Sequence, residues 1–458
     1  MVEGRTDRPV IQRERCHSCD VCIRGCPAEL IPEYRQETNT LRGVLYQEKF
    51  STSKRKIYVP PCQEACPIHQ DIRGYVALIA EGKFREALEV IGEVNPFPAV
   101  CGFICHHPCE QACLREGMDA PISIRLLKRF VAENGQKAEA VKKPPKKKRR
   151  GKVLVIGSGP AGLAASNDLR LHGFEVTIFE ALPVLGGMLA VGIPEFRLPR
   201  DILKRDIDRI RALGIQMETN RRFRFDGNGK VLQQLGFQAA FLSIGAHESQ
   251  KLGIAGESLG GVLPGLEFLR AVNLGEKTKV GKRVAVIGGG NVAIDAARSA
   301  IRLGAETVDV YYRRSRREMP AISDEVEEAI CEGVRIHVLS SPIQIIGRGG
   351  KAVGINFVKM ELTKRDETGR RKPVPVKGSN RKVYADTVIS AVGQRVNRNV
   401  LRGLDLDQSG NVRINAATYE TSIKGVFAGG DVVTGPGWAI DAIAAGKRGA
   451  EAIYQYLT

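Results

Sequence analysis

Ten of the eleven cysteines in this 458-residue chain lie within its first 113 residues, where their spacing suits the binding of metal clusters. Four of them form the run CHSCDVCIRGCP, with gaps of two, two and three residues before a proline. Thiolates at this spacing are typical of [4Fe–4S] ligation, whereas zinc sites favour two separated pairs of ligands. Ten thiolates suffice for two clusters, and we predict two. The expected ligands are Cys16, Cys19, Cys22, Cys26, Cys62, Cys66, Cys101, Cys105, Cys109 and Cys113.

A glycine-rich turn after an apolar stretch predicts a first dinucleotide-binding site. In KVLVIGSGPAGLAASNDLRLHGFEVTIFEA, a buried strand over 153–156 runs into the turn, and a second strand over 175–179 ends at an acid. One glycine permits the tight bend, the next lets the backbone approach a pyrophosphate, and the third lets the helix pack on the strand. The helix N-terminus attracts the phosphates, and the acid accepts hydrogen bonds from the ribose hydroxyls. The predicted binding residues are Gly157, Gly159, Pro160, Ala161, Gly162 and Glu180.

A second turn of this kind, in KRVAVIGGGNVAIDAARSAIRLGAETVDVYYRRSRREMPA, predicts an NADP(H) site. Strands are expected over 284–287 and 307–312, and the second ends in arginines rather than an acid. Guanidinium groups there suit a ribose 2′-phosphate, so we predict NADP(H) rather than NAD(H). Arg316 and Arg317 either belong to this site or are solvated surface charges. The predicted binding residues are Gly288, Gly290, Asn291, Val292, Arg313 and Arg314, with Ala293 at the third position of the turn.

The C-terminal segment GVFAGGDVVTGPGWAIDAIAAGKRGAEAI identifies the first dinucleotide as FAD. We expect a strand that ends at Gly429–Gly430–Asp431 and a helix that begins at Trp438–Ala439. A carboxylate at Asp431 suits the ribityl chain of a flavin. The N–H groups at the helix N-terminus suit the pyrimidine edge of the flavin and stabilise its reduced, anionic form.

The elements around the cysteines are expected to be short helices. Apolar residues recur at helical spacing in segments that start at Asp71 and Lys83, and Pro96 and Pro98 end the second helix. From residue 151 onward, strand–turn–helix units predict doubly wound α/β structure. The basic stretch 137–150 between these regions is either a solvated connector or a docking patch for an acidic partner.

Composition and charge narrow the class of protein. Hydrophobic residues make up 43% of the chain and charged residues 26%, no apolar run spans a bilayer, and no apolar segment follows the start. We therefore expect a cytoplasmic protein without a membrane span. The formal net charge of +18 favours an acidic electron-transfer partner, either a ferredoxin or other subunits of a redox complex. No nucleic-acid module is recognisable, so we expect no nucleic-acid binding.

Residues 60–458 resemble the small subunit of NADPH-dependent glutamate synthase. They also resemble the N-terminal part of dihydropyrimidine dehydrogenase and the NADPH-side subunit of electron-bifurcating transhydrogenases. The matching motifs are LGGMLAVGIPEFRLPRDI, GGGNVAIDAAR, YYRRSRREMPA, AVGQ and the Asp431 segment. The resemblance implies an α/β fold of two nested Rossmann-like domains after a mainly helical iron–sulfur domain, with NADPH stacking on the flavin. It also assigns Gly187, Met188 and Arg197 to the surroundings of the flavin and Gly393 to cofactor binding.

The residue pattern and the resemblance together give the following domain boundaries. An iron–sulfur domain is expected over 1–136, the basic linker over 137–150, and the NADP(H) domain over 279–396. That last domain would be inserted between two parts of the FAD domain, 151–278 and 397–458.

The cysteine pattern departs from that family. Two cysteines that the family has just upstream of Cys62 are missing, and its non-thiol ligand falls near Lys128, which cannot ligate iron while protonated. The run Cys16–Cys26 either replaces the missing ligands or leaves spare thiols. His69, His106 and His107 are expected to be polar neighbours of the thiols rather than ligands. Cys331, at a helix end, is expected to be a buried small hydrophobic residue.

These features predict an NADPH-dependent flavin and iron–sulfur oxidoreductase that works as a subunit. Hydride would pass between NADP(H) and FAD, and single electrons would pass through clusters to a partner, as in a bifurcating transhydrogenase or a ferredoxin:NADP reductase. A glutamate synthase small subunit is the alternative, and the extra cysteine run argues against it. A flavin disulfide reductase would need a cysteine pair where only Cys331 exists. A non-catalytic adaptor that carries clusters is the alternative of another class.

Overall fold

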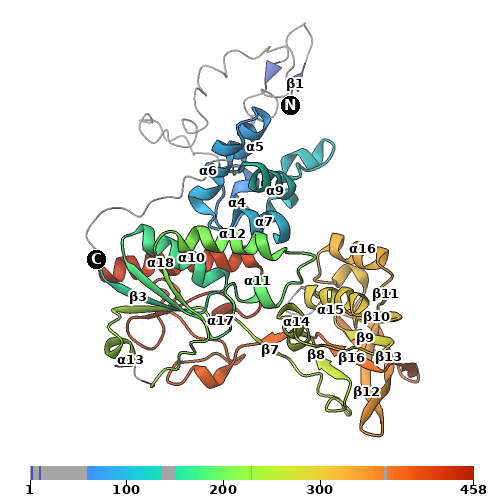
Figure 1. The fold of residues 1–458 in the computed structure, drawn as a ribbon. Coiled ribbons are helices and arrows are strands. Elements are labelled where there is room, and N and C mark those ends of the chain that lie inside the picture. The colour runs from blue at the N-terminus through green and yellow to red at the C-terminus, as the bar shows by residue number, and fades with distance from the viewer. Residues whose placement is uncertain (1, 4–9, 12–58, 136–149, 228–229, 366–368) are drawn as a thin grey trace. The chain divides into compact units, whose positions relative to one another are not determined.

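The computed structural model describes residues 2–3, 10–11, 59–135, 150–227, 230–365 and 369–458 (Figure 1). It divides the chain into two compact units, Met1–Ala140 and Val141–Thr458. Cys16, Cys19, Cys22 and Cys26 lie outside the described residues, as does the predicted linker apart from Arg150.

The first unit is mainly helical, and the predicted helices from Asp71 and Lys83 are α5 and α6. The Asp71 carboxylate accepts the backbone N–H of Gly74 at 2.9 Å and so caps α5. Apolar side chains from several helices, among them Tyr75, Ile91 and Val131, form the core. The elements are β1 (Val2–Glu3), β2 (Val10–Ile11), α4 (Pro61–Glu64), α5 (Ile72–Ala80), α6 (Phe84–Val94), α7 (Pro98–Ile104), α8 (Pro108–Gln111), the 3₁₀ turn η3 (Leu114–Gly117) and α9 (Ile124–Asn134).

No single helix in the described part of the chain has the length and apolar character needed to cross a membrane. Helices α6 and α7, which meet at a bend of 90°, reach that length and composition only when taken together.

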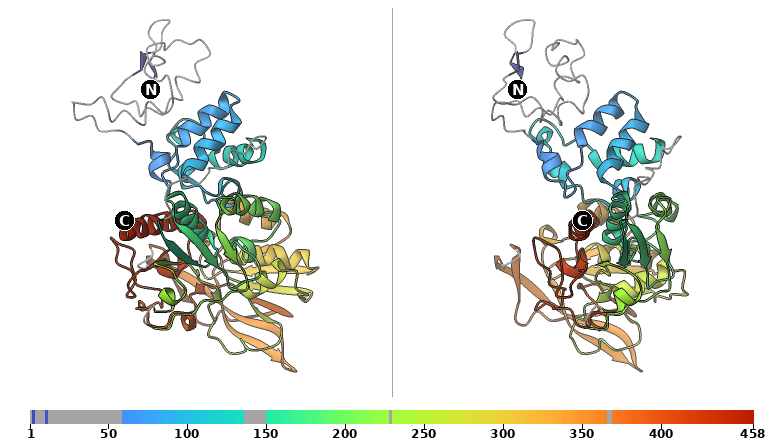
Figure 2. Two further views of the ribbon diagram at one scale, coloured as in Figure 1. Left: turned by 60° about the vertical axis from the view of Figure 1, so that its left-hand side comes forward. Right: turned by 90° about the vertical axis from the view of Figure 1, so that its left-hand side faces the viewer.

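The second unit contains two parallel five-stranded sheets. The first has the order β18–β6–β3–β4–β5, and its strands are short apolar runs covered on both faces. Helices α10 and α18 lie side by side against it (Figure 2). The elements are β3 (Lys152–Ile156), α10 (Pro160–Leu171), β4 (Glu175–Phe179), α11 (Met188–Val191), α12 (Arg200–Arg211), β5 (Gln216–Glu218), α13 (Lys230–Gln234), β6 (Ala239–Leu242), the 3₁₀ turn η6 (Arg398–Val400), β18 (Val426–Ala428), α17 (Asp431–Thr434) and α18 (Ala439–Leu457).

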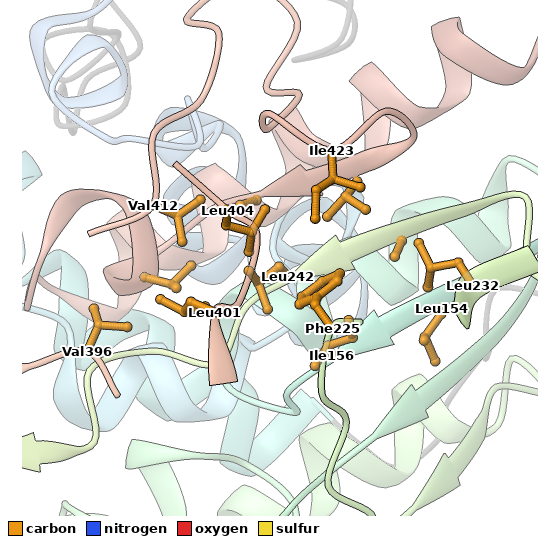
Figure 3. Close-up of a cluster of buried hydrophobic side chains, with 14 of the residues drawn as sticks. Leu154, Ile156, Phe225, Leu232, Leu242, Val396, Leu401, Leu404, Val412 and Ile423 are labelled. Atoms are coloured by element: carbon orange, nitrogen blue, oxygen red, sulfur yellow. The ribbon is translucent and has the colours of Figure 1, made fainter. Parts of the chain in front are cut away.

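The core on one side of this first sheet draws on distant parts of the chain. Leu154 and Ile156 of β3 and Leu242 of β6 pack with Leu404 and Val412 from the segment that follows the second sheet (Figure 3). The chain therefore leaves the first sheet, builds the second and returns, which is the nested arrangement that the resemblance implies.

The second sheet has the order β11–β10–β9–β16–β8 and is parallel throughout. Strand β8 belongs to this second sheet although it precedes residue 279, the expected start of the NADP(H) domain. An antiparallel arm formed by β12–β15 is inserted between β11 and β16. The elements are β8 (Val262–Pro264), α14 (Gly265–Asn273), β9 (Arg283–Ile287), α15 (Asn291–Arg302), β10 (Thr307–Tyr311), the 3₁₀ turn η5 (Arg316–Glu318), α16 (Ser323–Cys331), β11 (Arg335–His337), β12 (Ser340–Arg348), β13 (Lys351–Arg365), β14 (Arg371–Pro375), β15 (Arg381–Tyr384) and β16 (Thr387–Ser390).

Two chain segments connect the sheets, and they pair with each other. Strand β7 (Glu248–Ser249) on the way out forms an antiparallel pair with β17 (Gln394–Arg395) on the way back. The predicted fold class is confirmed, and the four predicted strands agree with β3, β4, β9 and β10 to within one residue at each end.

Candidate functional site

The glycines of the first turn have the conformations and contacts that a dinucleotide turn needs. Gly157 has φ +100°, and a Cβ at this position would lie 2.6 Å from the carbonyl oxygen of Ser243. A Cβ at Gly162 would lie 2.0 Å from the carbonyl oxygen of Gly157, because α10 packs directly on the turn. A Cβ at Gly159 would have no neighbour within 4 Å, so the turn is open on that side. This open side at the start of α10 fits the approach of a pyrophosphate.

Glu180 stands at the end of β4 and is tied to the glycine turn. Its Oε2 accepts hydrogen bonds from the backbone N–H of Ser158 at 2.9 Å and from the Ser158 hydroxyl at 2.6 Å. Its Oε1 accepts the backbone N–H of Leu182 at 2.8 Å. A carboxylate has about four lone-pair sites, so one remains on Oε1 for a ribose hydroxyl. Sequence reasoning missed Ser158, whose only signal was its place inside the glycine turn.

The loop after β4 brings Gly187 against the same turn, but it does not bring Arg197 there. A Cβ at Gly187 would lie 2.8 Å from the Cα of Gly159, and the backbone N–H of Gly186 donates to the Ser158 carbonyl at 3.1 Å. Met188 begins α11 directly afterwards. Arg197 instead forms ion pairs with helices α15 and α16 of the second sheet.

The C-terminal segment places Asp431 at the carboxyl end of β18, in the same edge of the sheet as the turn after β3. Burial raises the pKa of the Asp431 carboxyl to about 6. Trp438 precedes α18, whose first turn begins at Ala439, as predicted. The sequence did not reveal α17, a single turn that starts at Asp431 after Gly430, which has φ +77°.

Helices α10 and α18 pack very closely. A Cβ at Gly446 would lie 2.1 Å from the carbonyl oxygen of Ala161, and Lys447 pairs with Asp168 at 2.7 Å. The turn before α10 and the segment before α18 are thereby held in a fixed relation. Together with Glu180 they form a cradle for one extended dinucleotide, which fits FAD.

The second turn repeats this construction. Gly288 has φ +151°, and a Cβ there would lie 2.3 Å from the carbonyl oxygen of Ala391. A Cβ at Gly290 would meet only Pro320, at 3.8 Å. The side chain of Asn291 accepts the backbone N–H of Ile322 at 3.0 Å and holds the loop before α16.

The other predicted residues of the second site lie beside this turn. Val292 follows Asn291 in the first turn of α15 and contacts the backbone of α14: a Cβ at Gly265 would lie 3.3 Å from its Cγ1. Gly393 has φ +144° in the segment after β16, where a Cβ would lie 2.5 Å from Oε1 of Gln250. The turn, the start of α15 and the segment after β16 thus meet at one edge of the sheet.

The arginines after β10 differ from one another in their surroundings. Arg313 is exposed. Arg314 is buried, and its Nε donates to the carbonyl oxygen of Arg371 at 2.9 Å, so part of its guanidinium is used by the antiparallel arm. Arg316 pairs with Glu327 at 2.7 Å, and Arg317 is exposed. Arg313 and Arg317 are therefore the two exposed arginines of this segment.

Six cysteines of the first unit lie within the described residues, and all are free thiols. Cys66, Cys101 and Cys109 are buried, whereas Cys62, Cys105 and Cys113 are half-buried. Burial raises the pKa of Cys62, Cys105 and Cys109, in the last case to about 12. Among the described residues, no three His, Cys, Asp or Glu side chains stand close enough together to hold a metal ion. The run Cys16–Cys26 and its predicted ligation stay a prediction.

Neighbouring charges modify the pKa of these thiols. Burial raises the pKa of Cys105 and of Cys109, and Lys128, which is only 6% exposed, opposes that rise. Cys113 raises and Arg73 lowers the pKa of Cys62. Positive charge beside a set of thiolates offsets part of their negative charge.

Buried hydrogen-bond donors without an acceptor support the binding of an inorganic cluster among these thiols. Nε and Nη1 of Arg73 and Nδ2 of Asn95 are buried, and the described residues offer them no acceptor. Sulfur atoms of a cluster would accept such N–H groups, so the donor set fits [4Fe–4S] clusters.

That the histidines are polar neighbours rather than ligands stays a prediction, whereas the prediction that Cys331 is buried is wrong. The backbone N–H of His107 donates to Sγ of Cys105 at 3.4 Å, and its ring lies 3.4 Å from Glu110. Cys331 is exposed rather than buried. The buried positions of α16 include Val326 and Ala329. Cys331 follows Ala329 by two residues, which turns it about 200° around the helix from Ala329 and away from the buried side.

Comparison with known proteins agrees with this geometry. Residues 42–140 match the model of dihydropyrimidine dehydrogenase domain II, a 4Fe–4S cluster domain. The chain is 43% identical over 423 residues to the NADP(+)-dependent formate dehydrogenase subunit beta of Moorella thermoacetica, covering 87% of this chain but only 60% of that one. It is 33% identical over 423 residues to the glutamate synthase [NADPH] small chain of Escherichia coli, covering 87% of this chain and 89% of that one.

The fold is also found among solved structures. FprA of Mycobacterium tuberculosis in complex with NADPH superposes with a TM-score of 0.57 at 21% identity, covering 68% of this chain and 84% of that one. Residues 151–446 match the model of the pyridine nucleotide-disulphide oxidoreductases. The chain therefore belongs to the pyridine nucleotide-disulphide oxidoreductase family and carries a 4Fe–4S cluster domain ahead of the fold that binds FAD and NADP(H).

Proposed function

We propose that this chain is the NADPH-oxidising subunit of a larger redox enzyme, in which electrons pass from NADPH through FAD and [4Fe–4S] clusters to a partner. The observation that carries the proposal is that one chain combines two dinucleotide sheets with a separate unit rich in free thiols. When bound, FAD supplies the conversion of a two-electron donor into single electrons, which the clusters then carry.

The residues of the first sheet bind and orient FAD in this proposal. The N–H groups at the start of α10 face the pyrophosphate, Glu180 accepts a ribose hydroxyl, and Asp431 accepts hydroxyls of the ribityl chain. The N-terminus of α18 at Ala439 faces the pyrimidine edge and favours negative charge there. The full set is Gly157, Gly159, Pro160, Ala161, Gly162, Glu180, Gly187, Met188, Gly430, Asp431, Trp438 and Ala439.

The residues of the second sheet bind NADPH. The turn Gly288–Gly290 and the start of α15 at Asn291 and Val292 face the pyrophosphate, and Gly393 leaves room beside them. Arg313 supplies the guanidinium for the 2′-phosphate, with Arg314 fixed behind it by the carbonyl oxygen of Arg371. The preference for NADPH is supported by the absence of an acid at the end of β10.

The partner is proposed to be acidic and to receive electrons from the cluster unit. The net charge of +18 supports an acidic docking surface on a ferredoxin or another subunit. The relative from Moorella thermoacetica is itself named as a subunit of formate dehydrogenase, which supports assembly into a complex. Formate oxidation would then reside in a different chain.

A glutamate synthase small chain is the second candidate, because this chain covers 89% of that relative. The two functions differ in the partner, which for the second candidate would be a glutamate-forming large subunit.

The test is NADPH-driven reduction of a one-electron acceptor by the purified holoprotein. Under anaerobic conditions, a ferredoxin should be reduced with NADPH much faster than with NADH, and replacement of Cys66 by Ser should abolish ferredoxin reduction while leaving flavin reduction intact. Co-purification from the native source would identify the partner. Flavin reduction without any transfer to ferredoxin or to the co-purified subunit would contradict the proposal.

A further inference from the structure

Arg197 forms a buried ionic connection from the first sheet to the second. Its Nη1 lies 2.7 Å from Oδ2 and 2.9 Å from Oδ1 of Asp295 in α15, and its Nε lies 2.9 Å from Oε2 of Glu325 in α16. The side chains of Arg197 and Asp295 are only 6% and 4% exposed. Two charges so far from water are stable only when they are paired this closely.

The connection continues into the second sheet's helices. Glu325 Oε2 also lies 2.7 Å from Nη1 of Arg298, whose Nη2 lies 2.7 Å from Glu332. Phe196, the neighbour of Arg197, has its ring 4.7 Å from the guanidinium of Arg298 and 3.9 Å from that of Arg302. Two consecutive residues of one loop therefore contact two helices that belong to the other sheet.

The two ends of this connection lie close to the two dinucleotide turns. At one end, Gly186 and Gly187 contact Ser158 and Gly159 of the first turn, and they lie in the segment between β4 and α12 that also contains α11 and Arg197. At the other end, Asn291 is the first residue of α15 and directly follows the second turn. Asp295 lies four residues later, about 6 Å further along the axis of α15. A second contact supports the first: Nδ2 of Asn273 in α14 donates to the carbonyl oxygen of Val191 at 3.0 Å.

We propose that Arg197 is a positioning residue that fixes the start of α15, and with it NADPH, relative to the FAD cradle. This inference rests on the proposed function, because it concerns the approach of the nicotinamide to the flavin. It replaces the expectation that Arg197 belongs to the immediate surroundings of the flavin. Arg197 would act through Asp295 and Glu325 rather than by touching either cofactor.

A positioning role makes three measurable quantities change differently. Arg197→Gln should leave FAD content unchanged and alter the dissociation constant for NADP⁺ by no more than about twofold, because no cofactor contact is lost. The rate of flavin reduction at saturating NADPH should fall by at least about tenfold, since a small misplacement of reacting groups has a large kinetic cost. Arg197→Lys should recover part of that rate, because an ammonium can still pair with Asp295 but lacks the planar fork.

Hydrogen exchange supplies a readout that is independent of the reaction. In Arg197→Gln, amide exchange should rise in the loop over 193–199 and in α15, and not in α10 or α18. Asp295→Asn should produce the same pattern and serves as the second variant if Arg197→Gln folds poorly. Arg335→Gln is the matched control, because its 2.6 Å ion pair with Asp309 lies within the second sheet and should leave the rate and α15 unchanged.

The outcomes separate the possibilities. Loss of FAD from Arg197→Gln would make Arg197 a flavin contact and overturn the proposal. An unchanged reduction rate, or a rate loss equalled by the Arg335→Gln control, would also overturn it. Failure of NADPH to reduce the flavin of the wild-type protein would instead contradict the proposed function, and the exchange pattern would still test the connection itself.

Discussion

The carboxylate of Glu180 and the hydroxyl of Ser158 meet across the first glycine turn, 2.6 Å apart. The backbone N–H of Ser158 donates to the same carboxylate oxygen at 2.9 Å. The acid that ends β4 is therefore held by the turn that precedes α10, so two parts of the expected FAD cradle depend on each other.

Ser158→Ala should weaken FAD binding by about tenfold. The substitution removes one hydrogen bond to a buried carboxylate, and such bonds contribute about 1.5–3 kcal/mol. Flavin fluorescence, titrated against the flavin-free protein, measures the affinity. Ser166→Ala is the control, because that hydroxyl donates to the carbonyl oxygen of Gly162 at 2.8 Å on the same helix and should affect FAD little. Equal losses in both variants would mean that the Glu180 contact has no special role.

Arg313→Ala should weaken NADPH binding by about ten- to a hundredfold and NADH binding hardly at all. The expected cause is the loss of a charge-assisted hydrogen bond to the 2′-phosphate. Arg348→Ala, which removes an exposed arginine of the antiparallel arm, controls for the change in net charge. Dissociation constants for both nucleotides are measured by calorimetry. A similar loss for NADPH and NADH would remove the 2′-phosphate assignment.

Cys66→Ser should lower the iron content by up to one cluster per chain and leave the FAD content unchanged. The reason is that the thiols lie in a unit that is separate from the FAD cradle. Cys331→Ser should change neither quantity, because Cys331 is exposed and stands in the other unit. Iron, labile sulfide and flavin are counted anaerobically. An iron content equal to that of the wild-type protein in the Cys66→Ser variant would show that this thiol is not a ligand.

Asp431→Asn should stabilise the flavin-free protein at neutral pH while weakening FAD binding. Burial raises the pKa of Asp431 from 3.8 to about 6. The folded protein thus retains this proton more tightly than the unfolded chain, so ionisation lowers the free energy of unfolding as the pH rises from about 4 to 6, and the full penalty persists above that range.

Asparagine does not ionise, so the Asp431→Asn variant does not lose this free energy of unfolding, which amounts to about 3 kcal/mol at pH 7. Urea unfolding of the flavin-free proteins, compared between pH 4.5 and pH 8, measures the difference. The gain of the variant should be small at the acidic end and constant above pH 7. A gain that does not depend on pH would rule out ionisation of Asp431 as its cause.

Short sequence patterns predicted the elements whose conformation depends on residues close together in the chain. Gly157 and Gly288 mark turns with positive φ, and the apolar runs before them predict buried parallel strands. The start of α5 near Asp71 was predicted from apolar residues that recur at helical spacing. Strand β8 and helix α17 were not, because three or four residues carry no periodic pattern that can be recognised.

Contacts between distant residues account for what the sequence did not reveal. The motif that contains Arg197 and the motif that contains Asp295 were both recognised, but nothing in either indicated that they pair with each other across 98 positions. Arg314 looked equivalent to Arg313 until the carbonyl oxygen of Arg371, contributed by the antiparallel arm, was found beside it. The prediction that Cys331 is buried was wrong because it rested on the general tendency of free cysteines to be buried, and not on the position of Cys331 around α16.

In the proposed function, electrons from NADPH reach both the flavin and the clusters within this chain. An anaerobic titration of the holoprotein with NADPH tests this directly, followed by visible absorbance for the flavin and by low-temperature electron paramagnetic resonance for the clusters. We expect the flavin absorbance to bleach with NADPH and not with an equal amount of NADH, and the signals of reduced clusters to appear as the titration proceeds. A flavin that stays oxidised at excess NADPH, or a flavin that bleaches while clusters of accessible potential stay oxidised, would contradict the proposed function.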